Sequence, residues 1–263
     1  MFAFVDKHGA RLYNLRVRAK KGSKMDKLVN IIERRHMTRI VAFGSSNTEL
    51  GYHCEGHFNW FNWLEVGLAA HVGRKMTCIN TGVSGNICAQ LLERFDRDCA
   101  LFKPNIVIVT IGGNDSNPDR GITREMFRED LETLAGKVDC LDDAVLVLQT
   151  YYTFDAEKFS AKERGWAESF PAYMQVVRET ASAGGYTLID HQKRWELLRK
   201  NDAVLYRGLM RDPKHLKPLG NMVMGLDTLR AFGAGLYGEL PSQCAEGLKI
   251  QGIMDKLETE GRK

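Results

Sequence analysis

The sequence lacks the features that would place it among membrane or secreted proteins. Its longest stretch without a charged residue runs from Met76 to Leu92 and is interrupted by Asn, Thr and Gly, which excludes a membrane-spanning helix there. The apolar run at residues 1–5 is too short for the core of a secretory signal peptide. We therefore expect no membrane partner and a cytoplasmic location, unless a signal segment has been removed.

Paired cysteines are missing as well. The six cysteines are scattered along the chain and no two form a C-x-x-C pair, which indicates a reducing compartment rather than a disulfide scaffold. His53 and His57 stand four residues apart. Their spacing leaves a metal site open as an alternative, but we expect an ordinary loop there and no metal.

Two signatures of nucleotide-binding proteins and hydrolases are also absent. The chain contains no G-x-x-x-x-G-K-[ST] segment, which excludes a Walker-type phosphate loop. From Gly82 to Asn86 the sequence approaches the G-x-S-x-G nucleophile elbow, but an asparagine stands where the last glycine is needed. This departure counts against an α/β-hydrolase of the lipase type.

Positive charge is concentrated near the N-terminus. The net charge is +4, and residues 7–39 contain eleven Lys or Arg. A basic leader of this kind can bind nucleic acid or an anionic surface, and such binding would be lost when the residues before Met37 are deleted. Because no nucleic-acid-binding motif accompanies the leader, we expect a solvated segment and no nucleic-acid partner.

Short apolar runs alternate with helical patterns along most of the chain. The runs are rich in Val, Ile and Leu without strict alternation, which is typical of strands buried on both faces. The stretches between them are long enough for crossover connections. We therefore predict an α/β fold, a flavodoxin-like three-layer α/β/α sandwich with a five-stranded parallel sheet. Strands are expected at Arg39–Phe43, Met76–Asn80, Ile106–Ile111, Ala144–Gln149 and Tyr186–Asp190, and helices at Met25–Arg35, Trp60–Val72, Ile87–Phe102, Glu125–Lys137, Phe170–Gly184 and Leu219–Phe232.

Polar loops that contain glycine follow the first three predicted strands. They are Gly44-Ser45-Ser46, the segment from Gly82 to Asn86, and Gly113-Asn114-Asp115. Each alone is also what an ordinary turn requires, and the first would also suit a phosphate cradle. Ligands of parallel sheets bind at the carboxyl ends of the strands. Three such loops at one edge together favour a functional site more than any one of them does alone, with a nucleophilic serine or a phosphate cradle open for the first loop and an amide that can donate to an oxyanion in the third.

A fourth polar block lies near the C-terminus, where Asp212 and His215 are three residues apart. This spacing lets the carboxylate accept a hydrogen bond from the imidazole Nδ1 and leaves Nε2 to act as a base. Pro213, between them, stiffens the turn. Taken alone, the block would also suit an exposed turn with an incidental histidine.

In this order and with these gaps, the four blocks resemble the conserved blocks of the SGNH hydrolases, also called GDSL-type esterases. The resemblance spans roughly residues 38–229, and the Gly113-Asn114-Asp115 and Asp-x-x-His blocks are its most specific parts. It implies a serine esterase with Ser46 as the nucleophile, His215 as the general base and Asp212 as the carboxylate that orients it. It further implies an oxyanion hole formed by the backbone N–H of Ser46 together with Gly85 and Asn114.

The same resemblance implies acyl transfer in two steps through an acyl-enzyme, with no cofactor. It divides the chain into a leader of residues 1–37, an SGNH hydrolase domain of residues 38–235 and a tail of residues 236–263 that is expected to be helical, all within a single domain overall.

One position departs from the family pattern. The first family block reads Gly-Asp-Ser, whereas this chain has Gly44-Ser45-Ser46. In the family that aspartate mainly accepts a structural hydrogen bond, so the resemblance implies that catalysis survives the change at a cost in loop stability or rate. Two adjacent serines raise the question of which one attacks, and position favours Ser46.

The substrate is less clearly indicated. Residues 51–63 combine aromatic rings with His, Asn and Glu, a mixture that suits a sugar ring better than a long acyl chain. Many members of the family remove acetyl groups from carbohydrates. Trp60 and Trp63 have an alternative place in the core at a helix start. The residues expected to contact substrate are Asn47, His53, His57, Trp60 and Tyr151.

The leading prediction is therefore a short-acyl or carbohydrate O-acetyl esterase that acts on a small-molecule or carbohydrate ester. A lysophospholipase or thioesterase with the same triad is the first alternative, and a long apolar channel would favour it. A catalytically inactive SGNH-fold binding module is the second, and separation of Ser46 from His215 would favour that.

Overall fold

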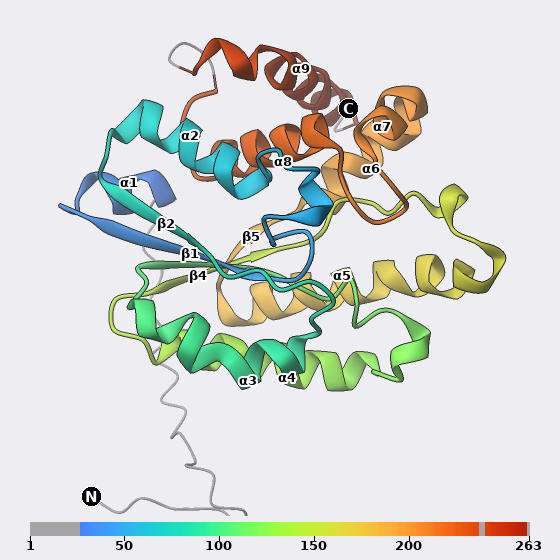
Figure 1. Cartoon of the computed structure of the whole chain (residues 1–263), viewed down its shortest axis with the longest axis horizontal. Coiled ribbons are helices and arrows are strands. Elements are labelled where there is room, and N and C mark those ends of the chain that lie inside the picture. The colour runs from blue at the N-terminus through green and yellow to red at the C-terminus, as the bar shows by residue number, and fades with distance from the viewer. Residues whose placement is uncertain (1–26, 237–239, 262–263) are drawn as a thin grey trace, which may run out of the picture.

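The computed structural model describes residues 27–236 and 240–261, and within them the chain forms one parallel sheet (Figure 1). Neighbouring strands all pair in parallel, in the order β2-β1-β3-β4-β5, so the predicted five-stranded flavodoxin-like sheet is confirmed. The strands are β1 (Thr38–Gly44), β2 (Met76–Asn80), β3 (Ile106–Thr110), β4 (Val145–Gln149) and β5 (Thr187–Ile189).

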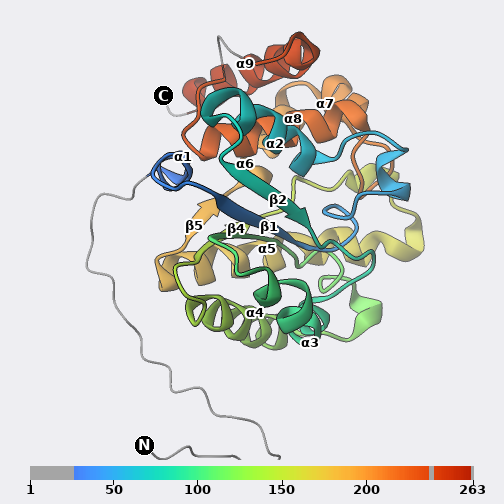
Figure 2. The ribbon, with the colours of Figure 1, turned by 60° about the vertical axis from the view of Figure 1, so that its left-hand side comes forward.

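Helices cover both faces of this sheet, which completes the three layers. One face carries α3, α4 and α5, and the opposite face carries α2, α8 and the helices around them (Figures 1 and 2). The helices are α1 (Leu28–Glu33), α2 (Trp60–Val72), α3 (Cys88–Asp98), α4 (Arg124–Asp139), α5 (Arg164–Gly184), α6 (His191–Asn201), α7 (Ala203–Leu209), α8 (Pro218–Ala231) and α9 (Ala245–Glu260).

The strands are apolar throughout because both of their faces are buried. In β1, Ile40 and Ala42 belong to the core under α2 and α8, while Val41 and Phe43 belong to the core under α3 and α4. Successive side chains of a strand point to opposite faces, so a strand between two cores needs no polar positions. Because β1, β2 and β3 are parallel, their carboxyl ends lie together at one edge of the sheet.

Helix boundaries agree with the sequence patterns to different degrees. α2 has the predicted bounds because the Asn59 side chain accepts hydrogen bonds from the N–H groups of Phe61 and Asn62, and the helix ends at Gly73 with φ 68°. α5 begins at Arg164, six residues before the predicted start, with Pro171 inside the helix. The sequence patterns did not predict α6 and α7.

The two ends of the chain are described only in part. The predicted helix at Met25–Arg35 corresponds to α1, while Met25 itself lies outside the described residues. Residues 1–26 of the basic leader, and residues 237–239 and 262–263 of the tail, lie outside them too. In the described part of the chain, no helix combines the length and apolar character that crossing a membrane would require.

Candidate active site

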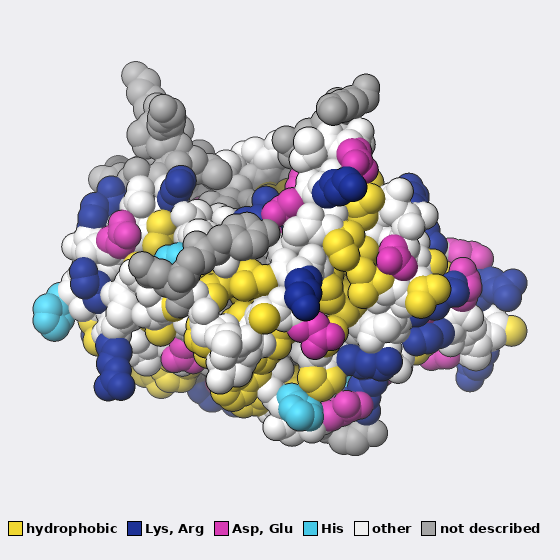
Figure 3. Space-filling view, turned by 90° about the horizontal axis from the view of Figure 1, so that it is seen from above, with side chains coloured by type: hydrophobic (Ala, Val, Ile, Leu, Met, Phe, Trp, Pro, Cys, Tyr) yellow, Lys and Arg dark blue, Asp and Glu magenta, His cyan; other side chains and the backbone are white. Residues whose placement is uncertain are grey.

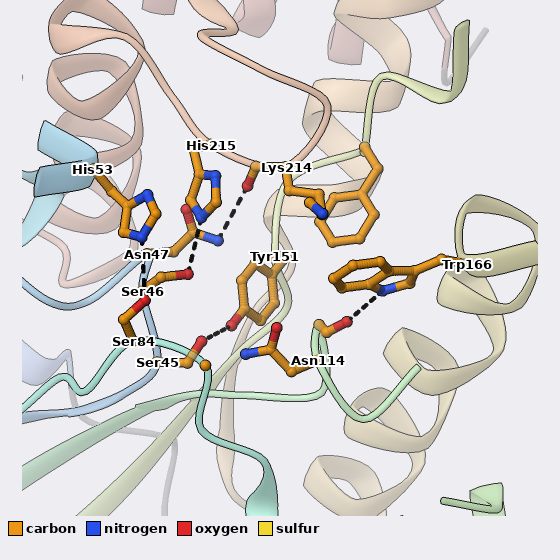
Figure 4. A pocket seen from close by; sticks show the side chains of 13 residues that line it. Ser45, Ser46, Asn47, His53, Ser84, Asn114, Tyr151, Trp166, Lys214 and His215 are labelled. Atoms are coloured by element: carbon orange, nitrogen blue, oxygen red, sulfur yellow. Dashed lines mark hydrogen bonds between the residues drawn. The ribbon is translucent and has the colours of Figure 1, made fainter. Parts of the chain in front are cut away.

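The loops that follow β1, β2 and β3 meet the segment before α8 at one edge of the sheet and enclose a small pocket (Figure 4). Its volume is about 130 Å³. It is lined by Ser45, Ser46, Asn47, His53, Ser84, Gly85, Gly113, Asn114, Tyr151, Phe154, Trp166, Lys214 and His215.

Ser46, His215 and Asp212 form a continuous hydrogen-bonded chain in this pocket. The Ser46 Oγ lies 3.0 Å from His215 Nε2, and His215 Nδ1 lies 2.9 and 2.8 Å from the two carboxylate oxygens of Asp212. Burial acts to raise the pKa of Asp212, but hydrogen bonds from the His215 ring and from the backbone N–H groups of Lys214 and His215 hold it well below its usual range. Asp212 therefore stays ionised and can orient the imidazole.

The segment that carries Asp212 and His215 is closed on itself. Met210 and Leu216 pair as an antiparallel bridge, and the Arg211 N–H donates to the His215 carbonyl at 2.9 Å. Asp212 and His215 both lie between the two bridged residues. Their relative position therefore follows from this local turn and does not depend on long-range packing alone.

The hydroxyl groups of Ser45 and Ser46 have different partners. Ser45 Oγ lies 2.6 Å from the Tyr151 hydroxyl and the residue is 1% exposed, whereas Ser46 is 8% exposed and faces His215. Residue 44, directly before the two serines, must be glycine. A Cβ at this position would lie 2.5 Å from Thr48 Oγ1 and 2.6 Å from the Thr110 carbonyl oxygen. The geometry thus presents Ser46, and not Ser45, to the base.

Gly85 and Asn114, which with Ser46 form the predicted oxyanion hole, line the same pocket. Gly85 has φ 78°, a conformation that glycine adopts freely. The Asn114 Nδ2 donates to the Asn86 carbonyl at 2.9 Å, which fixes the amide at the pocket wall and leaves its second N–H for another acceptor. The close-up shows the Asn114 amide nitrogen on the side that faces Ser45 (Figure 4).

Arg94 on α3 ties these loops together and was missed by the sequence analysis. Its guanidinium donates to the carbonyls of Thr81 (2.7 Å) and Gly44 (3.0 Å) and to Asn86 Oδ1 (2.8 Å). One cation thus joins the loops after β1 and β2. An arginine within a helical pattern is ordinarily an exposed charge, so no sequence signal marked it.

Three further pocket residues were also missed. Trp166, on the early turns of α5, donates from Nε1 to the Gly113 carbonyl at 2.7 Å. The Lys214 ammonium lies 3.9 Å from the centre of the Trp166 ring, and Phe154 completes this aromatic wall. Trp166 could not be placed because the predicted helix began after it.

A model of the GDSL-like lipase/acylhydrolase family matches residues 42–223, a segment that contains all the residues of this hydrogen-bonded chain. The chain belongs to this family. No curated protein matches its sequence.

Solved structures similar to this GDSL-like protein share its fold. The acetylxylan esterase Axe2 from Geobacillus stearothermophilus is 19% identical, with a TM-score of 0.64 over 80% of this chain and 99% of that one. LAE5, an alpha/beta hydrolase enzyme from the metagenome of Lake Arreo, Spain, is 23% identical, with a TM-score of 0.64 over 77% of this chain and 98% of that one. At these identities the likeness concerns the fold.

In this GDSL-like site, two of the predicted substrate contacts are themselves tied to the catalytic segments. Asn47 Oδ1 accepts from the Tyr152 hydroxyl at 2.7 Å, and its Nδ2 donates to the Lys214 carbonyl at 3.3 Å. The His53 ring stacks on His215 with 4.0 Å between ring centres and 12° between planes. Tyr151 lines the pocket but is only 1% exposed.

The structure does not bring two other expected contacts to this pocket. The Trp60 side chain is fully buried in the core under α2, because its position on the inner face of the helix points it away from the pocket. His57 lies in a separate surface hollow of about 520 Å³ with Phe58 and Trp63. Figure 3 shows the face that carries α2, α8 and α9, where exposed hydrophobic side chains lie among charged ones.

The metal alternative also fails on geometry, because His53 faces the pocket and His57 the separate hollow. Among residues 27–236 and 240–261, no three His, Cys, Asp or Glu side chains come together in a way that could hold a metal ion.

Proposed function

We propose that this protein is a serine esterase that cleaves short-acyl esters through an acyl-enzyme on Ser46. The observation that carries the proposal is the unbroken hydrogen-bonded chain from Ser46 through His215 to Asp212 on a pocket of about 130 Å³. Hydrogen-bond reach between Ser46 and His215 also argues against an inactive binding module.

In the first step Ser46 Oγ attacks the ester carbonyl carbon while its proton passes to His215 Nε2. The negative charge that develops on the carbonyl oxygen is stabilised by the N–H groups of Ser46 and Gly85 and by the Asn114 amide. When the carbon–oxygen bond to the alcohol breaks, His215 returns the proton to the leaving oxygen. Water then repeats the sequence on the acyl-enzyme and releases the acid.

The size and lining of the pocket favour a short acyl group. Sites for drug-sized ligands are typically about 300–1,000 Å³, whereas this pocket is about 130 Å³ and has Tyr151, Phe154 and Trp166 in its lining. A long acyl chain would need an apolar channel, so a lysophospholipid fits less well. Because the similar protein Axe2 is described as an acetylxylan esterase, we propose that an acetylated carbohydrate is the substrate class.

The test is hydrolysis of p-nitrophenyl acetate, butyrate and octanoate, and release of acetate from acetylated xylo-oligosaccharides. Wild-type protein should prefer acetate over octanoate, and Ser46→Ala should lose activity by more than about a thousandfold while staying folded. Ser182→Ala is the matched control, because Ser182 is exposed at the far end of α5.

Two outcomes contradict the proposal. Full activity of Ser46→Ala would remove the nucleophile assignment. A preference for octanoate would replace the short-acyl assignment with the lipid one.

A further inference from the structure

His53 connects two parts of the site that are distant in sequence. It lies in the 3-10 turn η1 (Tyr52–Cys54) of the loop between β1 and α2. One face of its ring stacks on His215, and its Nε2 lies 3.1 Å from the Ser84 hydroxyl. Ser84 directly precedes Gly85. The close-up shows the His53 ring beside the His215 ring, with its hydrogen bond to Ser84 dashed (Figure 4).

We propose that His53 is a positioning residue: its ring holds the His215 imidazole toward Ser46, and its bond to Ser84 ties the base to the loop that carries Gly85. This inference rests on the proposed function, because it concerns how the same base and the same oxyanion loop are held. It assigns His53 a role beyond the substrate contact expected from the sequence.

The stack also has an electrostatic consequence. A neutral ring face attracts a neighbouring cation, so neutral His53 stabilises the imidazolium that forms on His215 as Ser46 attacks. Two protonated rings at this distance repel each other. His53 should therefore help the reaction only while it is uncharged.

The surroundings of His53 keep it uncharged at neutral pH. Burial lowers its pKa, as do His215 and Arg211 from the segment before α8, while Glu49 and Asp212 act in the opposite direction. Arg211 in turn pairs with Glu55 at 3.3 Å. Because the net result is a pKa below the ordinary value, His53 becomes protonated only in acid.

The kinetic test compares variants that remove the two contacts separately. His53→Ala removes both the stack and the bond to Ser84, and should lower kcat by about ten- to a hundredfold with KM nearly unchanged. His53→Phe keeps a ring against His215 and should recover part of this loss. Ser84→Ala keeps the stack and should cost less than His53→Ala.

The matched control for these variants is His57→Ala, an exposed histidine of the same loop, which should behave as wild type. If His53→Ala raised KM and left kcat unchanged, His53 would be a substrate contact and the positioning role would be wrong.

A second measurement does not depend on activity. In wild-type protein the charge on His215 disfavours protonation of the stacked His53 ring and so lowers the pKa of His53. In His215→Phe, which keeps a ring against His53, NMR titration of the His53 ring protons should therefore give a higher pKa than in wild type. An unchanged pKa of His53 would overturn the inference.

The two measurements separate the two proposals. A higher pKa of His53 in His215→Phe, together with a wild-type protein that hydrolyses no ester, would contradict the proposed function while supporting the contact between the rings. An active esterase in which the pKa of His53 does not respond to His215→Phe would do the reverse.

Discussion

At the scale of single residues, the two adjacent serines differ in their hydrogen-bond partners. Ser45 is buried against the Tyr151 hydroxyl at 2.6 Å, while Ser46 faces His215. A carboxylate is the usual family residue at position 45, and here a neutral pair of hydroxyl groups takes its place. This pair needs no compensating charge in the buried wall of the pocket.

The pairing predicts a specific pattern of stabilities. Ser45→Ala should remove the Ser45 partner of the buried Tyr151 hydroxyl and cost about 1–3 kcal/mol of unfolding free energy. Tyr151→Phe should likewise cost stability, and the double variant should cost less than the sum of the two, because both polar groups are then gone. Urea unfolding of the four proteins measures the coupling, and strict additivity would contradict it.

The sequence predicted Ser46, Asn114, Asp212 and His215 as one set of candidate site residues but could not indicate Tyr151 as the partner of Ser45. Those four residues were located by their positions within short sequence motifs, which can be read without knowing the fold. The hydroxyl pair joins residues 106 positions apart, and it depends on how the loop after β4 packs beside the loop after β1. For the same reason the stack of His53 on His215 had no local signal.

At the scale of elements, Asp115 anchors the start of α3 to the loop after β3. Its Oδ1 accepts the Cys88 N–H at 2.8 Å, and the carboxyl group is 1% exposed. A carboxylate at a helix N-terminus is favourable, but burial raises the pKa of Asp115 to about 6. The anchor is therefore charged at neutral pH at a cost in stability.

This cost predicts a pH dependence with a definite sign. The folded-state pKa of Asp115 lies above the ordinary value of 3.8, so the folded protein binds the proton more tightly than the unfolded chain does. The contribution of Asp115 to stability therefore falls as pH rises from about 4 to 6. Asp115→Asn removes the charge. The difference in unfolding free energy between this variant and wild type should shift by about 2 kcal/mol in favour of the variant between pH 4.5 and pH 7.5. Chemical unfolding of both proteins at the two pH values tests this, and an equal difference at both would contradict it.

Elements with a local signal were predicted well, and those that depend on tertiary contacts were not. α2 has a capping asparagine at one end and a glycine at the other, so its bounds could be predicted. The early turns of α5 are held by Trp166, whose indole donates to Gly113, a contact that no periodic pattern encodes. α6 carries buried Arg194 and His191 within a polar sequence, so it lacks the apolar stripe by which helices are found.

At the scale of the whole molecule, a buried ionic network attaches the last helix to the rest of the domain. Arg194 of α6 lies 2.8 Å from Asp227 of α8, and 2.9 and 2.5 Å from Asp255 and Glu258 of α9. His191 Nδ1 lies 2.8 Å from the second oxygen of Asp227. Burial acts to raise the pKa of Asp227, but His191 and Arg194 hold it below its usual range. Three helices thus share one cation whose side chain is 5% exposed.

Removal of that cation should destabilise the whole fold. Arg194→Met leaves the buried Asp227 without its closest cation, and loss of one partner of a buried pair costs about 3–5 kcal/mol. For a domain of this size the melting temperature should fall by roughly 10 °C.

Arg199→Met, on the same helix, is the matched control. Arg199 is 36% exposed and pairs with Glu196 at the surface, so its loss should cost less than about 1 kcal/mol. Differential scanning calorimetry of the two variants measures both values. Equal melting temperatures would mean that apolar packing, through residues such as Met254, holds α9 without the network.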